Sequence, residues 1–83
     1  MSIWDGVSEF VTVVDAGSFS AAAKRLGVST SYVSRRVADL EARLGIRLLA
    51  RSTRTVRMTD AGSEYYRRCT DLVAGLQEAN QAV

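Results

Sequence analysis

The chain has 83 residues, of which 47% are hydrophobic and 24% are charged, so it is long enough for one domain with a modest core and is not of disordered composition. It contains no histidine and a single cysteine, Cys69, which excludes an intramolecular disulfide, a Cys/His zinc site and the Ser-His and Cys-His nucleophile pairs. The formal net charge of +2 says little by itself about partners.

The first predicted element is a helix that begins at Ser2 or Ile3 and ends at Ala16. Acidic side chains in its early turns favour this start, because the helix dipole stabilises negative charge there. We expect its apolar side chains, Trp4 included, to face the core. They recur at helical spacing and form one stripe, made of Trp4, Val7, Val11 and Val14 with Phe10 beside it.

A short second helix is predicted to follow a cap at Ser18 or Ser20 and to end at Gly27. Val28 is expected to fill the core within the turn. Ser29 is the predicted cap of the next helix, because its side chain can accept a hydrogen bond from an otherwise unpaired amide. The residues of the second helix that we expect to pack inward are Phe19, Ala22, Ala23 and Leu26.

The third predicted helix runs from Thr30 to Leu44 and ends before a glycine. Its apolar residues are spaced by four, three and four positions and therefore share one face, namely Val33, Val37, Leu40 and Leu44. The opposite face carries Ser31, Arg35 and Ala38, with Tyr32 and Ser34 on its flanks. Hydroxyl, guanidinium and methyl groups contact base edges and phosphates, so we interpret this helix as one that lies in a DNA groove.

Two short strands, 47–51 and 55–58, are predicted on either side of a turn at 52–54. A two-stranded hairpin that follows a DNA-reading helix is a wing. This one carries three arginines, Arg51, Arg54 and Arg57. An ordinary solvated edge hairpin is the alternative interpretation.

The last predicted helix is capped by Thr59 and ends at about Gln81. Its apolar residues repeat at spacings of four and three, which is the period of a coiled-coil seam. A helix of ~22 residues is ~33 Å long, so a small three-helix core cannot cover all of this face and a second copy of the chain is expected to do so. A missing C-terminal domain is the alternative cover. The seam consists of Tyr65, Cys69, Leu72, Leu76, Ala79 and Val83.

The charges are unevenly distributed along the chain. The segment from Lys24 to Arg57 holds nine basic residues against Asp39 and Glu41, a local net charge of +7, while the remaining residues sum to −5. A basic middle between acidic ends is typical of phosphate binding, although a solvated charged face would look the same from charge alone.

An ordered set of short motifs closely resembles the N-terminal DNA-binding domain of LysR-type transcriptional regulators, and the resemblance covers nearly the whole chain. The motifs are Gly17-Ser18-Phe19-Ser20-Ala21-Ala22-Ala23, Leu26-Gly27-Val28-Ser29, Val33-Ser34-Arg35, Leu40-Glu41, Leu44-Gly45, Leu48-Leu49, Arg51-Ser52-Thr53-Arg54 and Thr59-Asp60-Ala61-Gly62. The resemblance implies a mainly α winged helix-turn-helix in residues 1–58, followed by a long linker and dimerisation helix in 59–83.

The resemblance also implies how DNA is bound. In this family linker helices pair antiparallel in a dimer that binds an interrupted palindrome, with the start of the recognition helix (30–44) in the major groove and the wing (51–57) at the minor groove. Ser34 and Arg35 match the family's helix contacts and Arg54 matches its wing arginine. Thr30 and Ser31 depart from the Gln-Pro pair of many members, and threonine cannot make the bidentate adenine contact of glutamine.

The candidate DNA-binding residues have alternative roles. Arg35 is the best base-reading candidate and a phosphate clamp otherwise; Arg36 lies nearer the core and is expected to bind phosphate or a carboxylate. Tyr32 contacts a phosphate or a thymine methyl, or is partly buried. Arg54 suits a narrow minor groove. The full set is Thr30, Ser31, Tyr32, Ser34, Arg35, Arg36, Arg51, Ser52, Thr53 and Arg54.

Family members are usually longer, so we expect the effector-binding domain, and with it any small-molecule effector, to be absent from this chain; the full-length protein could be a tetramer. The alternative function is a winged-helix module that binds proteins without DNA. An enzyme is not supported, and we expect no catalytic residue, metal or cofactor. No apolar run approaches the ~20 residues of a membrane span. We expect a cytoplasmic, nucleoid-associated protein with no membrane partner.

Overall fold

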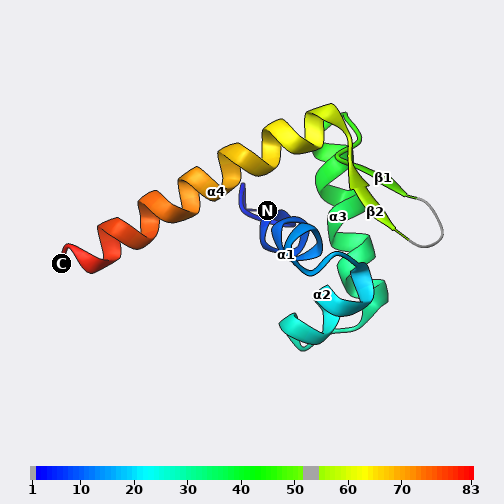
Figure 1. Cartoon of the computed structure of the whole chain (residues 1–83), viewed down its shortest axis with the longest axis horizontal. Helices are drawn as coiled ribbons and strands as arrows, with labels where there is room; N and C mark the ends of the chain where they lie inside the picture. The colour runs from blue at the N-terminus through cyan, green and yellow to red at the C-terminus, as the bar shows by residue number, and fades with distance from the viewer. Residues whose placement is uncertain (1, 52–54) are drawn as a thin grey trace.

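The computed structural model describes residues 2–51 and 55–83, with the side chain of Arg51 left out. Its elements follow the order α1 (Val7–Ala16), α2 (Phe19–Leu26), α3 (Thr30–Leu44), β1 (Leu49–Arg51), β2 (Val56–Met58) and α4 (Asp60–Gln81). The two strands pair antiparallel, with Leu49 opposite Met58. Four helices and one hairpin make this a mainly α winged helix-turn-helix, as the sequence predicts (Figure 1).

The core lies between α1, α2 and α3 and is closed by the hairpin and the first turns of α4. Its buried side chains are Val7, Phe10, Val13, Ala22, Ala23, Val33, Val37, Leu40, Leu48, Leu49 and Cys69. The remainder of α4 leaves this body, and its C-terminal end lies far from the other helices (Figure 1). None of the helices within the described ranges is both long enough and apolar enough to cross a membrane.

Within the described ranges, side chains cap α2, α3 and α4, whereas α1 begins after Gly6 without a side-chain cap. Ser18 accepts a hydrogen bond from the Ala21 amide at 3.0 Å, so the cap of α2 is Ser18 and not Ser20. Ser29 and Thr59 cap α3 and α4 as predicted, since each hydroxyl accepts from an amide three residues later. The predicted start and end of α3 are therefore correct, as is the end of α4 at Gln81.

The start of α1 was predicted wrongly. The helix begins at Val7, because Gly6 adopts a left-handed conformation with φ of 85° that no helix interior contains. Gly6 also lies close to α3: a Cβ atom there would be 2.8 Å from the Arg36 carbonyl oxygen. With the helix shortened, Trp4 falls in a turn and is 49% exposed, so it is not a core residue.

Two other expected core residues are exposed. Val28 is 38% exposed, because its amide bonds to the Ala23 carbonyl and closes the end of α2 while the side chain faces outward. Leu44 is 43% exposed and is the last residue of α3 before the Gly45 cap. Leu48 and Leu49, which follow α3, fill the core at that end in its place. The strands are also shorter than predicted, at three residues each.

Candidate nucleic-acid interface

The start of α3 presents a polar face outside the core. Val33 and Val37 are fully buried and fix the rotation of the helix, which leaves the other side of its first turns in solvent. Of the residues predicted to contact DNA there, Thr30, Ser31, Tyr32 and Arg35 are exposed and Ser34 is half-buried. The structure therefore brings these five side chains together on one accessible surface that combines hydroxyls with one long cation.

Further exposed cations lie in the neighbouring elements. Lys24 and Arg25 are exposed in the last turn of α2, Arg57 is exposed on β2, and Arg47 is exposed in the segment before β1. The hairpin lies on the side of the molecule away from the C-terminal end of α4 (Figure 1). The predicted wing residues 52–54 and the side chain of residue 51 lie outside the described part of the chain.

A buried carboxylate joins the wing to α3. Glu41 is only 7% exposed, and its Oε2 atom accepts hydrogen bonds from the amides of Leu48 at 2.8 Å and Leu49 at 3.2 Å. These amides open β1, so without the carboxylate they would be buried and lack this acceptor. Glu41 thereby fixes the base of the hairpin relative to the recognition helix.

The start of α4 is hydrogen-bonded to the segment that leads into β1. The Thr59 hydroxyl donates to the Arg47 carbonyl oxygen at 2.7 Å, and the Thr59 amide donates to the Leu48 carbonyl at 3.0 Å. Gly62 is buried against this backbone, and a Cβ atom there would lie 1.9 Å from the Leu48 oxygen. Only glycine permits this approach, so the base of the hairpin and the start of α4 are held together.

Arg36 is engaged by carboxylates rather than free. Its guanidinium lies 3.5 Å from Asp5 and 3.6 Å from Glu9, which corresponds to the carboxylate-binding role predicted as one of its two alternatives. Desolvation opposes its charge, but the neighbouring carboxylates outweigh this and raise the pKa of the guanidinium. A phosphate contact by Arg36 stays a prediction.

The seam of α4 divides into two parts. Tyr65 stacks at an angle on Phe10, with ring centroids 5.7 Å apart, and Cys69 is 4% exposed, so both belong to the core of their own chain. Burial raises the pKa of the Cys69 thiol. Nearby on the same helix, the Tyr66 hydroxyl donates a hydrogen bond to Asp15, and this bond raises the pKa of Tyr66. The other seam residues are all exposed, namely Leu72, Leu76, Ala79 and Val83.

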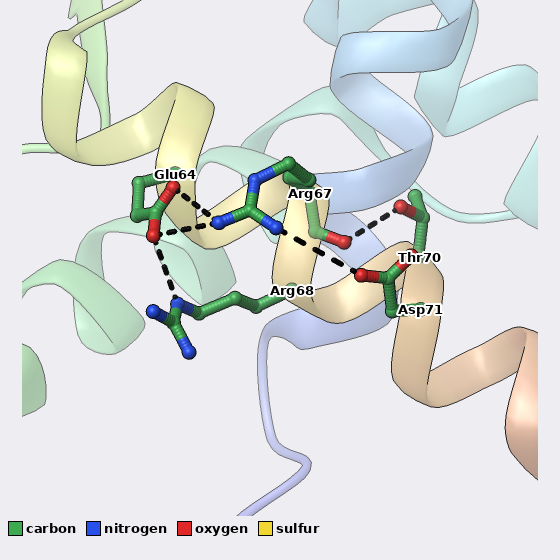
Figure 2. A network of polar contacts seen from close by, with 5 residues as sticks. All are labelled: Glu64, Arg67, Arg68, Thr70 and Asp71. Carbon is green, nitrogen blue, oxygen red and sulfur yellow. Dashed lines mark hydrogen bonds and ion pairs between the residues drawn. The ribbon is translucent and has the colours of Figure 1, made fainter.

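The opposite face of α4 is polar. Figure 2 shows Glu64 between two guanidiniums, 2.7 Å from Arg67 and 3.0 Å from Arg68, while Arg67 also reaches Asp71 at 4.0 Å. Hydrogen bonds from Arg67 and Arg68 lower the pKa of Glu64. These contacts link consecutive turns of one helix and neutralise the cations of α4, so this face adds no free basic cluster to the interface among the described residues.

Several residues that shape the interface were not assigned a role from the sequence. Glu41 and Gly62 stand in the quoted motifs, but only the folded chain shows which backbone each of them meets. A glycine inside a helix that is otherwise well formed was the available indication for Gly62, since it commonly marks a close backbone approach. For Glu41, the indication was a carboxylate next to a core residue on the buried side of α3.

Comparison with known proteins identifies relatives across most of the chain. The family model described as "Bacterial regulatory helix-turn-helix protein, lysR family" matches residues 4–63. An HTH-type transcriptional regulator of Xanthomonas campestris pv. campestris is 50% identical over 74 residues, which are 89% of this chain and 22% of that protein. This chain spans about a quarter of the length of the curated relatives it matches.

Two solved structures illustrate the similarity of fold. The complex of the BenM DBD with catB site 1 DNA matches with a TM-score of 0.87 and 33% identity, covering 92% of this chain and 82% of that one. Full-length CbnR complexed with its target DNA matches with a TM-score of 0.83 and 34% identity, covering 93% of this chain and 27% of that one.

Proposed function

Because the chain belongs to the LysR family of bacterial regulatory helix-turn-helix proteins, we propose that it is the sequence-specific DNA-binding part of a transcriptional regulator. Residues 1–58 are the winged helix-turn-helix and residues 59–83 are the linker helix. The observation that carries this proposal is the exposed polar face at the start of α3, a helix whose Glu41 carboxylate also accepts hydrogen bonds from the amides at the base of the hairpin. The relatives are regulators and not enzymes, and we assign this chain no catalytic role.

In this proposal α3 enters the major groove with its N-terminal turns foremost. Arg35 is long enough to donate two hydrogen bonds to a guanine edge, and Ser31 and Ser34 contact bases or phosphates beside it. Lys24 and Arg25 clamp the DNA backbone. The wing lies at the minor groove, with Arg54 as its reader of groove width. The Glu41 and Thr59 hydrogen bonds would keep α3 and the wing in a fixed spacing, so that both grooves are engaged together.

We further propose that the chain forms a homodimer through the exposed half of α4. Leu72 and Leu76 are 58% and 55% exposed, which is costly for an isolated helix in water. A groove of about 250 Å³ continues this apolar surface between α1 and α4, lined by Trp4, Val7, Ser8, Val11, Thr12 and Val73. A second copy paired antiparallel would cover both and set two α3 helices on an interrupted palindrome.

The whole regulator extends beyond this domain. Its relatives are about four times longer, so a small-molecule effector would act through a further domain. Tetramers would form only in the full-length protein. We propose that the protein works at the nucleoid in the cytoplasm, because DNA is its proposed partner.

The test is selection from a pool of random duplexes. The 83-residue chain is incubated with the pool at two salt concentrations, and the retained duplexes are sequenced. An interrupted palindrome with steep salt dependence is expected, because neutralised phosphates release counterions. Retention without enrichment would contradict sequence-specific reading, and no retention at low salt would contradict DNA binding.

Arg35→Ala sharpens the assignment of the base reader. We expect it to cost roughly 1–3 kcal/mol on the selected duplex and to relax specificity at one base pair per half-site. Lys24→Ala is the matched control, since a phosphate clamp weakens all sequences alike. Equal weakening of all duplexes by Arg35→Ala would make Arg35 a phosphate contact.

A further inference from the structure

One flank of α3 lies against the N-terminal segment at Arg36 and Arg43, while Tyr32, nearer the start of the helix, stays partly exposed. Tyr32, Arg36 and Arg43 are spaced by four and seven residues, so they line one side of the helix next to its apolar stripe. Arg43 donates to the backbone carbonyl oxygens of Asp5 and Ser2. The segment that precedes α1 is therefore fastened along the flank of the recognition helix.

Gly6 allows this segment to lie close to α3. A Cβ atom at Gly6 would lie 2.8 Å from the Arg36 carbonyl oxygen and 2.9 Å from the Leu40 Cβ atom, so only glycine fits. The close approach brings two carboxylates, from Asp5 and from Glu9 one helical turn later, to the same guanidinium. Neither position is explained by the core, because both side chains point to a charged residue of another helix.

Arg36 is held firmly at this contact. Its side chain is 30% exposed and that of Glu9 is 13% exposed, so water screens the pair less than it would a surface ion pair. The Arg36 Nε atom is buried and has the Glu9 carboxylate at 3.6 Å as its charge partner, without a hydrogen bond. Because two carboxylates already contact the Arg36 guanidinium, it is poorly suited to bind phosphate. Its plane is also held in one orientation.

That plane lies over an aromatic ring at the front of α3. The Arg36 guanidinium carbon is 5.8 Å from the centroid of the Tyr32 ring, within the range of a cation–π contact. Tyr32 is 38% exposed, so its side chain stays partly accessible beside the DNA-facing residues. The ring is thus restrained before any ligand arrives.

We propose that Asp5, Glu9 and Arg36 are positioning residues that hold Tyr32 in place to recognise a thymine methyl group in the major groove. The thymine methyl is the apolar group that base edges present there, and the accessible ring edge of Tyr32 is the matching surface. This inference rests on the proposed DNA-binding function.

The test compares thymine with deoxyuridine, which lacks only the methyl group. Each thymine of the selected half-site is replaced by deoxyuridine in turn, and the affinity of the full chain is measured by fluorescence anisotropy. We expect one position per half-site to lose about fourfold in affinity, the factor that corresponds to burial of one such group. Tyr32→Ala should bring the ratio at this position to one.

The positioning residues are tested by the same ratio. Arg36→Gln and Glu9→Gln should each reduce the thymine-to-deoxyuridine ratio toward one, even where loss of a carboxylate raises overall affinity for DNA. Glu78→Gln removes the same charge from the far end of α4 and should leave the ratio unchanged. A Tyr32→Ala background should abolish the effect of Glu9→Gln, which a merely structural role would not.

The possible outcomes distinguish failure of the positioning role from failure of the proposed DNA-binding function. A ratio kept at the wild-type value in Arg36→Gln and Glu9→Gln overturns the positioning role. Sequence-specific binding in which no deoxyuridine position matters overturns methyl recognition and leaves the DNA-binding function intact. A wild-type chain that selects no sequence overturns both. Thermal unfolding of each variant identifies loss of fold, and Glu9→Gln decides if Arg36→Gln does not fold.

Discussion

The two halves of α4 carry the same apolar repeat and have opposite surroundings. In the first half, Gly62 and Cys69 are buried and Tyr65 packs on Phe10. In the second half, Leu72 and Leu76 are more than half exposed, and the C-terminal end of the helix lies far from the other elements (Figure 1). The comparison shows that periodicity identifies the apolar face of a helix but not the element that covers it. In one helix, the first half anchors and the second half is available to a partner.

The largest effect should come from Gly62→Ala, which breaks the anchored half. The new Cβ atom would meet the Leu48 carbonyl oxygen at 1.9 Å, so the backbone must move and the Thr59 hydrogen bonds at the base of the wing must loosen. We expect the free energy of unfolding to fall by about 3 kcal/mol, at the upper end of the cost of overpacking. Urea unfolding followed by far-UV circular dichroism measures it.

Gly75→Ala is the matched control in the free half of the same helix. A Cβ atom there meets nothing within 4 Å, and alanine is the better helix former, so the change should stabilise the helix by roughly 0.5–1 kcal/mol. The same substitution thus has opposite signs in the two halves. Destabilisation by both variants would contradict the division of α4.

Leu76→Asp should disrupt dimerisation through the exposed half of α4 without affecting the packing of its first half. A charge in the proposed dimer interface removes about 2 kcal/mol of apolar burial per copy and adds a desolvation cost. We expect dimerisation to weaken at least tenfold by sedimentation equilibrium, with an unchanged unfolding midpoint of the monomer. Gln77→Asp adds the same charge beside the seam and should leave the dimer intact. A Leu76→Asp chain that remains dimeric would place the interface elsewhere.

The sequence predicted the features that depend on local contacts and missed those that depend on contacts between elements. Local rules were sufficient for the caps at Ser29 and Thr59 and for the extent of α3, because each depends on neighbours within one turn. They failed at Trp4, where the deciding contact is that of Gly6 with α3, thirty residues away along the chain. Glu41 and Gly62 were missed for the same reason, since the backbone they meet belongs to another element.

Cys69 offers a chemical comparison of the halves. Burial raises its pKa, so less thiolate forms at a given pH than in an unfolded chain, and the thiolate is the species that reacts. We expect its alkylation rate at pH 8 to be far below that of the urea-unfolded chain. The stabilisation linked to this shift is present below the ordinary thiol pKa and is lost as pH rises through the raised value.

The matched variant moves the thiol to the other half. In Cys69→Ala combined with Leu76→Cys, the single thiol lies on the exposed part of the seam and should react rapidly in dilute protein. Protection that increases with protein concentration would support its burial in the proposed dimer. Equal rates for the two positions at low concentration would contradict the difference in exposure.

The smallest effect is expected from Glu64→Gln, on the polar face of the anchored half. The substitution removes the carboxylate that pairs with Arg67 and Arg68 (Figure 2), but all three side chains are exposed and salt screens them. The melting temperature should fall by less than Gly75→Ala raises it, and the difference should vanish at high salt. The carboxylate has a lowered pKa, so its contribution is present above its unfolded value and is lost as pH falls through the folded one. Glu78→Gln, in the free half, should show no such salt dependence, and a salt dependence of equal size there would mean that the pairing of Glu64 adds nothing to the anchoring of α4.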